Sequence, residues 1–283
     1  MADVAFPWFG GKALLLPEIL KFIPQHRTYV EVFGGSAAVL LAKDQAPVEI
    51  YNDLDSGLVN FFRVMRDPFK SRRLIEMCQL TPYAREEYNY ARDHWGDEPD
   101  DLIKAYEWYI VARWSFSGVF GRAMAFDVAT TAAGIAGRVR KWHNAIAKLP
   151  NFCNRILDVQ VEHRDFREIL GMYDRPETLF YLDPPYVPET RKDGEYAHEL
   201  VFEDHVEMTD MLLDIQGMAI LSGYSHKVYM PLEEAGWERN DYDTFLWSDL
   251  RPVGDNRPRD KRVESLWISP TCKARHKQMS LFA

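Results

Sequence analysis

The chain of 283 residues has few cysteines and no long apolar segment. Its three cysteines, Cys78, Cys153 and Cys272, lie far apart, which excludes a clustered zinc site and favours a reducing compartment. No apolar run approaches the roughly 20 residues that a membrane span requires. Residues 1–12 contain no basic stretch followed by an apolar core, so we expect no secretory signal and a cytoplasmic protein.

Basic residues are also scarce, with 34 Lys+Arg against 43 Asp+Glu and a formal net charge of -9. Such an acidic total argues at first against a nucleic-acid partner. The charges are unevenly distributed, however. Residues 111–150 contain six basic side chains and one acidic one, and 251–262 have a net charge of +3. The acidic residues gather in 192–214 and 231–249, so one basic face remains compatible with an anionic partner.

The order of elements predicts an α/β fold without internal repeats or low-complexity linkers. A β-branched and aromatic run at 28–33 ends in two glycines, a helix is predicted over 36–43 with Ser36 as its N-cap, and a second strand follows at 48–51. Such a unit builds parallel sheets. Further strands are predicted at 157–162, 178–182, 218–221 and 263–268. The segment between residues 67 and 150 loses this alternation and is predicted to be a mainly helical insertion.

The sharpest motif is Asp183-Pro184-Pro185-Tyr186, directly after the apolar strand at 178–182. Ligands of open α/β sheets bind beyond the carboxyl ends of strands, where this tetrad falls. Two prolines stiffen the chain, so the Asp183 carboxylate and the Pro184 carbonyl can point at one NH₂ group while Tyr186 offers a face for stacking. A proline-rich turn after a strand is the alternative, but all four residues together favour a binding site.

A glycine turn follows the first predicted strand, in the run Glu-Val-Phe-Gly-Gly-Ser at 31–36. It lacks the G-x-G-x-x-G spacing of a dinucleotide fingerprint, although Gly34 and Gly35 still permit close approach of a ligand. Asp53 comes 18 residues after Gly35, a spacing that suits hydrogen bonds from ribose hydroxyls. Each feature alone is typical of an ordinary turn. Together they favour a cofactor that contains a nucleoside.

Two weaker signals complete the pattern. Residues 6–12, Phe-Pro-Trp-Phe-Gly-Gly-Lys, combine aromatics, glycines and a lysine, as ordinary packing with a solvated charge also would. Asp165 and Phe166 follow the predicted strand at 157–162 and could hold an adenine ring. A helix cap and a core phenylalanine explain this pair equally well.

In this order the four signals resemble the Dam-type DNA adenine methyltransferase family. The match runs through 7–12, 31–35, 52–53 and 183–186, and the middle of the chain matches only loosely. The resemblance implies S-adenosylmethionine as the cofactor and the exocyclic amino group of adenine in double-stranded DNA as the methyl acceptor. It also implies a prokaryotic or phage-infected cell as the setting.

The resemblance further implies a Rossmann-like class I methyltransferase sheet, formed by residues 1–66 and 151–283, with residues 67–150 inserted as the target-recognition domain. By position it assigns the cofactor contacts to Trp8, Lys12, Phe33, Gly34, Gly35, Asp53, Asp165 and Phe166, and the target base to Asp183, Pro184, Pro185 and Tyr186. Positioning and electrostatics suffice for this chemistry, without a metal. The base has to leave the duplex, which costs a few kcal/mol.

DNA contacts are predicted in the loop 115–122 and at the basic residues that follow it. In related enzymes this loop commonly has Asn-Gly and then Arg, whereas Ser117 stands here in place of Asn, so a GATC target is not implied. The candidates are Phe116, Ser117 and Arg122 in the loop, and Arg138, Arg140 and Lys141 for phosphates. Core packing of Phe116 and solvated surface for the cations are the alternatives.

Four other functions remain open. The tetrad also suits methylation of the cytosine amino group or of adenine in RNA. A nicotinamide-dependent oxidoreductase is disfavoured by the missing G-x-G-x-x-G spacing. A DNA-binding protein without catalysis would have no chemical need for the intact tetrad.

Overall fold

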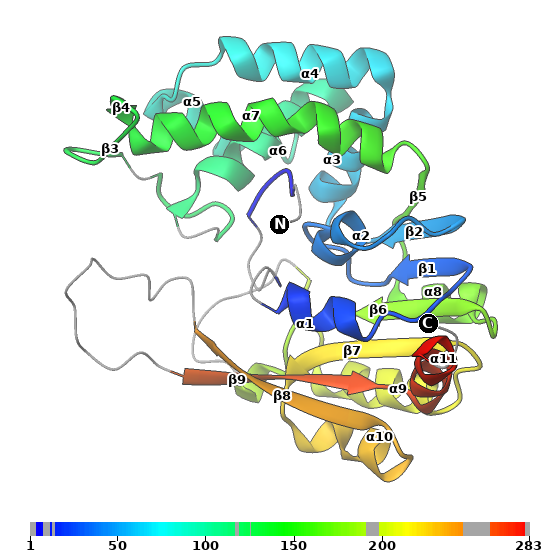
Figure 1. Cartoon of the computed structure of the whole chain (residues 1–283). Helices are drawn as coiled ribbons and strands as arrows, with labels where there is room; N and C mark the ends of the chain where they lie inside the picture. The colour runs from blue at the N-terminus through cyan, green and yellow to red at the C-terminus, as the bar shows by residue number, and fades with distance from the viewer. Residues whose placement is uncertain are drawn as a thin grey trace.

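A computed structural model describes residues 4–7, 12, 15–116, 119–124, 126–190, 198–245 and 261–280. Its centre is a seven-stranded sheet in the order β5-β2-β1-β6-β7-β9-β8 (Figure 1). The first five strands in this order are parallel, and β9 and β8 each run antiparallel to the preceding strand. The strands are β1 (Thr28–Glu31), β2 (Val48–Asn52), β5 (Val159–Glu162), β6 (Thr178–Leu182), β7 (Met218–Tyr224), β8 (Glu238–Phe245) and β9 (Lys261–Ile268).

This architecture confirms the predicted Rossmann-like α/β fold, and β8 is the one strand of the seven-stranded sheet that was not predicted. Its sequence, ERNDYDTF, is rich in charged residues, as suits a strand at the edge of the sheet. The central strand β6 is buried along its whole length, as its apolar sequence predicts.

Helices cover both faces of the sheet, and the alternation of side chains along each strand decides which face each residue joins. On β1, Val30 packs into a core with α8, α9 and α10, whereas Tyr29 packs into a second core with α3 to α7. The helices thus form one layer at each of these cores, and in Figure 1 the layer of α3 to α7 lies above the strands. The first of these layers is formed by α8 (Phe166–Tyr173), α9 (Phe202–Leu213) and α10 (Met230–Glu234).

The opposite face carries the predicted helical insertion. Its helices are α4 (Pro68–Leu80), α5 (Arg85–His94), α6 (Asp101–Trp114) and α7 (Gly137–Ile156), and a small hairpin of β3 (Thr131–Ala132) and β4 (Ile135–Ala136) precedes α7. Helices α4, α6 and α7 pack on α3 (Ser56–Arg66), whereas α5 packs on α6. Phe61 of α3 stacks on Tyr109 of α6 with ring centroids 5.1 Å apart. Helix α7 continues past the expected boundary at residue 150 and leads directly toward β5, because Trp142, Leu149 and Phe152 bury one continuous side.

The remaining described elements are short or lie at the ends of the chain. They are α1 (Leu16–Lys21), α2 (Ala38–Ala42), the 3₁₀ turns η2 (Pro188–Thr190) and η3 (Lys227–Tyr229), and α11 (Pro270–Ser280). Among the described residues, no helix is both long and apolar enough to cross a membrane.

Ser36 is not the N-cap of the first crossover helix, contrary to the prediction. Helix α2 begins at Ala38, and the cap residue Ala37 adopts φ 56° without a capping side chain. The reason lies in β1, where the Glu31 carboxyl accepts the backbone N–H of Leu40 at 2.8 Å. A strand residue therefore satisfies the helix N-terminus that Ser36 was expected to cap.

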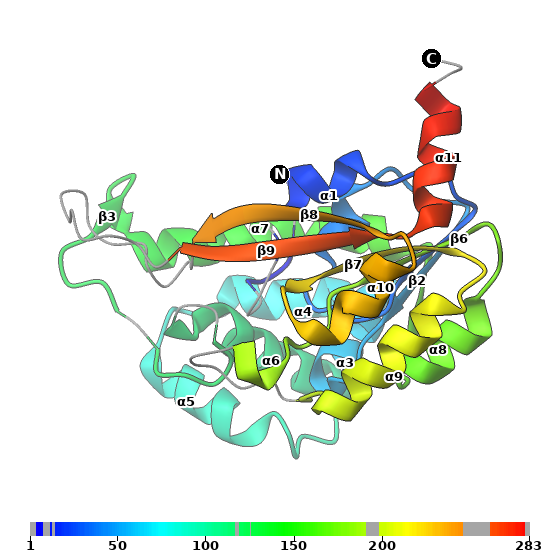
Figure 2. The ribbon, with the colours of Figure 1, turned by 90° about the horizontal axis from the view of Figure 1, so that it is seen from below.

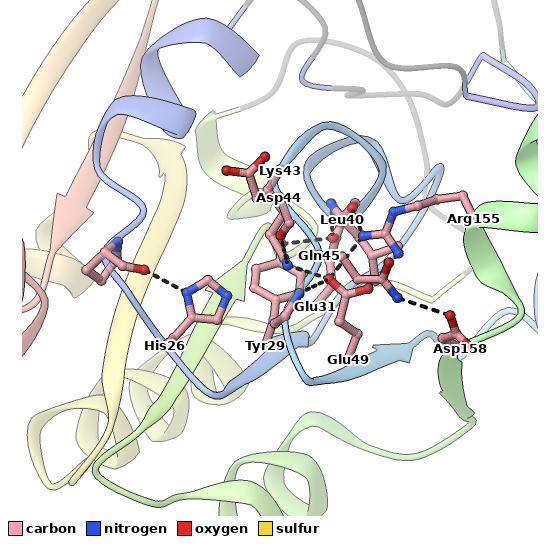
Figure 3. A network of polar contacts seen from close by, with 12 residues as sticks. His26, Tyr29, Glu31, Leu40, Lys43, Asp44, Gln45, Glu49, Arg155 and Asp158 are labelled. Atoms are coloured by element: carbon pink, nitrogen blue, oxygen red, sulfur yellow. Dashed lines mark hydrogen bonds and ion pairs between the residues drawn. The ribbon is translucent and has the colours of Figure 1, made fainter.

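A buried ion cluster connects α7 to the first βαβ unit (Figure 3). Lys43 and Glu49 are almost fully buried, and the Lys43 Nζ lies 2.5 Å from the Glu49 Oε1. Arg155 of α7 donates to the same carboxylate at 2.6 Å and to the carbonyl of Leu40 at 2.6 Å. The Tyr29 ring packs under the Lys43 ammonium, 4.3 Å from its centroid. Each charge therefore has an opposite charge or an acceptor within hydrogen-bond distance.

Candidate active site

A pocket opens at the carboxyl ends of β1, β2 and β6. Strand β1 lies between β2 and β6, so the chain crosses over in opposite directions from this point, and ligands of doubly wound sheets bind there. The pocket brings together most of the residues predicted for the cofactor and the target base, and none of those predicted for DNA contacts. It is lined by Lys12, Glu31, Val32, Phe33, Gly34, Gly35, Ser36, Ala38, Val39, Asn52, Asp53, Leu54, Asp55, Arg164, Phe166, Tyr181, Asp183, Pro185, His198 and Leu200.

The glycine turn forms one wall of this pocket and is attached to the end of β2. The Gly34 N–H donates to the Asn52 carbonyl at 2.7 Å, and the Tyr51 hydroxyl donates to the Gly35 carbonyl at 2.7 Å. A Cβ at position 34 would lie 2.2 Å from the Tyr51 ring, and Gly35 adopts φ 48°. Both positions therefore require glycine, for space at Gly34 and for backbone conformation at Gly35.

Asp53 faces the pocket from the end of β2. Its carboxylate accepts the backbone N–H groups of Gly35 at 2.8 Å and of Asp55 at 2.9 Å. Burial raises the pKa of Asp53 to about 6, against the lowering effect of these two hydrogen bonds. Asp53 thus holds the glycine turn in place and still presents an acceptor to the pocket.

Phe33 and Phe166 form an apolar end of the same pocket, with ring centroids 5.8 Å apart. Asp165 does not line the pocket. It caps helix α8 by accepting the Arg167 N–H at 2.9 Å, and it pairs with the Arg167 guanidinium, which also packs on the outer side of the Phe166 ring. The structure therefore brings Phe166 to the pocket and places Asp165 as the helix cap.

The tetrad follows β6 as predicted, and Lys12 contacts two of its members. The Lys12 Nζ lies 2.7 Å from the Asp183 Oδ1 and 2.5 Å from the Tyr186 hydroxyl. The Lys12 side chain is 3% exposed and the Asp183 side chain 20%. Burial raises the pKa of the Asp183 carboxyl above its usual range, while Lys12 and a hydrogen bond from Ser222 act in the opposite direction.

Tyr186 is largely buried between two neighbours. The Lys12 ammonium lies 4.8 Å from its ring centroid, and the Tyr224 ring lies 4.3 Å away at a tilted angle. Lys12 therefore holds Tyr186 at its hydroxyl, while the Tyr224 ring packs against the Tyr186 ring. Pro184 is buried beside it, and Pro185 lines the pocket.

Two polar residues of this region were missed in the sequence. Glu31 is buried at the pocket wall, where desolvation raises its pKa to about 8 in spite of hydrogen bonds from Tyr29 and Leu40. Ser222 of β7 donates to the Asp183 Oδ1 at 3.0 Å. The position of Glu31 just before the two glycines was a usable signal. Nothing near Ser222 in the sequence indicates its contact with Asp183.

The predicted DNA contacts lie away from the pocket lining, around the insertion. Phe116 is 48% exposed and so is not a core residue, and Arg122, Arg140 and Lys141 are exposed as well. Arg138 is half-buried at the start of α7, where its backbone N–H donates to Asp127. Of the predicted site residues, Trp8 and Ser117 lie outside the described residues. Among the described residues, no group of three or more His, Cys, Asp or Glu side chains is arranged to hold a metal ion.

Several curated proteins are similar to this chain. The type II methyltransferase M1.LlaDCHI of Lactococcus lactis subsp. cremoris is 28% identical over 235 residues, which cover 76% of this chain and 78% of that protein. The DNA adenine methylase of Escherichia coli K12 is 24% identical over 185 residues, or 64% of each chain. The DNA N-6-adenine-methyltransferase of Escherichia phage P1 is 23% identical over 216 residues, which span 74% of this chain but only 28% of the phage protein.

The family match covers most of the chain. It runs from the N-terminal segment that ends at Lys12, through the tetrad, to α10. The profile of the D12 class N6 adenine-specific DNA methyltransferases matches residues 8–232. This range contains the glycine turn, Asp53 and the tetrad, whose geometry is described above. The chain therefore belongs to the D12 class N6 adenine-specific DNA methyltransferase family.

Proposed function

We propose that this protein transfers a methyl group from S-adenosylmethionine to the exocyclic amino group of adenine in double-stranded DNA. The observation that carries the proposal is the position of the Asp183 carboxylate. It lies in the same pocket as the glycine turn and Asp53, so one cavity can hold both a nucleoside cofactor and an amino group. Family membership and the names of the relatives support the same reaction.

The residues present fit S-adenosylmethionine. Phe33 and Phe166 provide an apolar end for the adenine ring, and Asp53 accepts hydrogen bonds from the ribose hydroxyls. The turn at Gly34 and Gly35 lines the pocket, so its backbone would lie beside a bound cofactor. Glu31 and Asp183 line the same pocket and would offer carboxyl groups to a cationic cofactor.

On the base side, Asp183 and the Pro184 carbonyl accept the two amino protons of a flipped adenine. Two such bonds favour a pyramidal nitrogen whose lone pair points at the methyl carbon. When bound, the cofactor supplies a methyl group on a cationic sulfur, so the N–C bond forms as the C–S bond breaks with its electrons on sulfur. Asp183 then accepts one proton from the nitrogen, helped by its raised pKa.

The position of Asp53 leads to an expected pH dependence of cofactor affinity. Its pKa of about 6 means that the carboxyl is mostly ionised at pH 7.5 and mostly protonated at pH 5. We expect S-adenosylmethionine to bind about tenfold more weakly at pH 5 than at pH 7.5, measured by calorimetry. Glu31, with a pKa of about 8, stays mainly protonated over this window. Asp53→Asn should remove most of the dependence, and an unchanged profile in that variant would contradict the assigned role.

The basic end of α7 and the preceding loop are proposed to face the DNA phosphates. The β3–β4 hairpin and the start of α7 lie at the opposite end of the molecule from α11 (Figures 1 and 2). This separation offers a matched pair of lysines. Lys141 is an exposed residue near the start of α7, whereas Lys273 of α11 pairs with Glu238 at 2.9 Å.

Replacing Lys141 by alanine is expected to weaken DNA binding and to make it less sensitive to salt. The reason is that one fewer counterion is released from the DNA on binding. The slope of log affinity against log salt should fall by about one. Fluorescence anisotropy at several salt concentrations measures it. Lys273→Ala should leave the slope unchanged. Equal slopes for wild type and both variants would remove α7 from the proposed DNA face.

One experiment tests the donor and the acceptor together. Radiolabelled methyl transfer from S-adenosylmethionine to unmethylated DNA, followed by sequencing of modified sites, should give labelled DNA and one recognition sequence. Labelled RNA with unlabelled DNA would favour the RNA alternative. A thermal shift with NAD but not with S-adenosylmethionine would favour the oxidoreductase alternative.

A further inference from the structure

Two buried hydroxyl groups, those of Tyr181 and Ser222, form a hydrogen-bonded chain that ends at the Asp183 carboxylate. Ser222 lies on β7, beside β6, in the row after the Leu182–Leu221 pair, and it is fully buried. Its Oγ lies 3.0 Å from the Asp183 Oδ1 and 3.1 Å from the Tyr181 hydroxyl. The Leu182 carbonyl is a more distant alternative acceptor at 3.3 Å.

The number of protons determines the direction of this chain. Ser222 and Tyr181 each carry one hydroxyl proton, and the ionised Asp183 carboxylate carries none. Burial raises the pKa of Tyr181 well above its ordinary value, so its phenol keeps the proton. Tyr181 therefore donates to Ser222, and Ser222 donates to Asp183.

The contacts with Lys12 and Ser222 gather on one carboxylate oxygen. Both approach the Asp183 Oδ1, at 2.7 and 3.0 Å, and they are its hydrogen-bond partners among the described residues. The Oδ2 is therefore the oxygen left to accept an amino proton. Because Ser222 belongs to the rigid centre of the sheet, its bond restricts rotation of the Asp183 side chain.

We propose that Ser222, oriented by Tyr181, is a positioning residue that turns Asp183 so that its Oδ2 meets the amino group of the base. This inference rests on the function proposed above. The residue does not line the cofactor pocket, so its effect is expected on methyl transfer and not on cofactor affinity.

The pH dependence of methylation separates this role from a purely structural one. The charged and titratable groups around Asp183 are Lys12 with the Tyr186 hydroxyl bound to it, Glu31 of β1, Tyr181 of β6 and Tyr229 of η3. All of them remain when Ser222 is replaced by alanine. The variant loses one bond that favours the ionised carboxylate, so the acidic limb of kcat/KM should move to higher pH.

The test compares Ser222→Ala and Tyr181→Phe with a matched control, Ser265→Ala. Ser265 is equally buried on β9 and donates to the Asp241 Oδ1 at 2.6 Å, outside the pocket. We expect Ser222→Ala to lower kcat/KM for DNA by roughly 10- to 100-fold, with unchanged affinity for S-adenosylmethionine. Tyr181→Phe should give a smaller loss with the same shift of the acidic limb, and Ser265→Ala should match wild type.

A carboxyl ¹³C NMR titration of Asp183 provides a readout that does not depend on activity. Asp183→Asn assigns the signal, and Ser222→Ala should titrate at higher pH than wild type. An unchanged titration, an unchanged pH profile, or an equal loss in Ser265→Ala overturns the inference. An inactive wild type would instead contradict the proposed function, and the titration would still test the hydrogen bond.

Discussion

Asp183→Ala is expected to lower the kcat of DNA methylation by roughly a thousandfold. The substitution removes the carboxylate that accepts an amino proton, and it leaves the buried Lys12 without its partner at 2.7 Å. Phe33, Phe166 and Asp53 remain in place, so S-adenosylmethionine should still bind. Single-turnover methyl transfer and calorimetry measure the two effects separately.

Asp183→Asn is the matched control for shape. It keeps the size of the side chain and one carbonyl acceptor but removes the charge that pairs with Lys12. We expect it to retain cofactor binding and to be strongly impaired in transfer. Near-wild-type transfer by either variant would exclude Asp183 as the residue that holds the amino group.

The second large effect is expected on stability. Glu49→Ala removes the carboxylate shared by Lys43 and Arg155, and Lys43 is then buried without its counterion. Breaking a buried pair in this way lowers the free energy of unfolding by about 3–5 kcal/mol. Denaturant unfolding measures the change.

A surface pair of the same chemistry serves as the control. Arg73 and Glu76 pair at 2.6 Å on α4, with both side chains more than half exposed. Glu76→Ala should lower the free energy of unfolding by at most about 1 kcal/mol, because solvent screens this pair. Equal losses of unfolding free energy in Glu49→Ala and Glu76→Ala would show that the buried cluster stabilises the fold no more than a surface ion pair.

The first βαβ unit and the tetrad could be predicted because their signals are local. Glycines at 34 and 35 end a β-branched run, and the prolines at 184 and 185 follow an apolar strand. Strand β8 was missed because its charged sequence resembles a surface loop, and only pairing with β9 makes it a strand. Ser36 was predicted as the helix cap from local sequence. The acceptor for a backbone N–H at the start of that helix is instead the carboxyl of Glu31, which lies on a strand.

Within the site, residues whose roles depend on tertiary contacts could not be predicted. Ser222 meets Asp183 across 39 residues, through the pairing of β6 with β7. Asp165 is the opposite case. It accepts the backbone N–H of Arg167, only two residues away, so the local sequence already indicated a helix cap as its alternative role. Phe166, the next residue, lines the pocket. Two adjacent residues therefore have different roles, one in the pocket and one as the helix cap.

The central claim is that an adenine amino group occupies the place beside Asp183, and the modified nucleoside tests it most directly. DNA incubated with the wild-type protein and S-adenosylmethionine is digested to nucleosides and analysed by mass spectrometry. We predict N6-methyldeoxyadenosine from the wild type and none from Asp183→Ala. N4-methyldeoxycytidine, or no methylated nucleoside from a wild type that binds the cofactor, would contradict the claim.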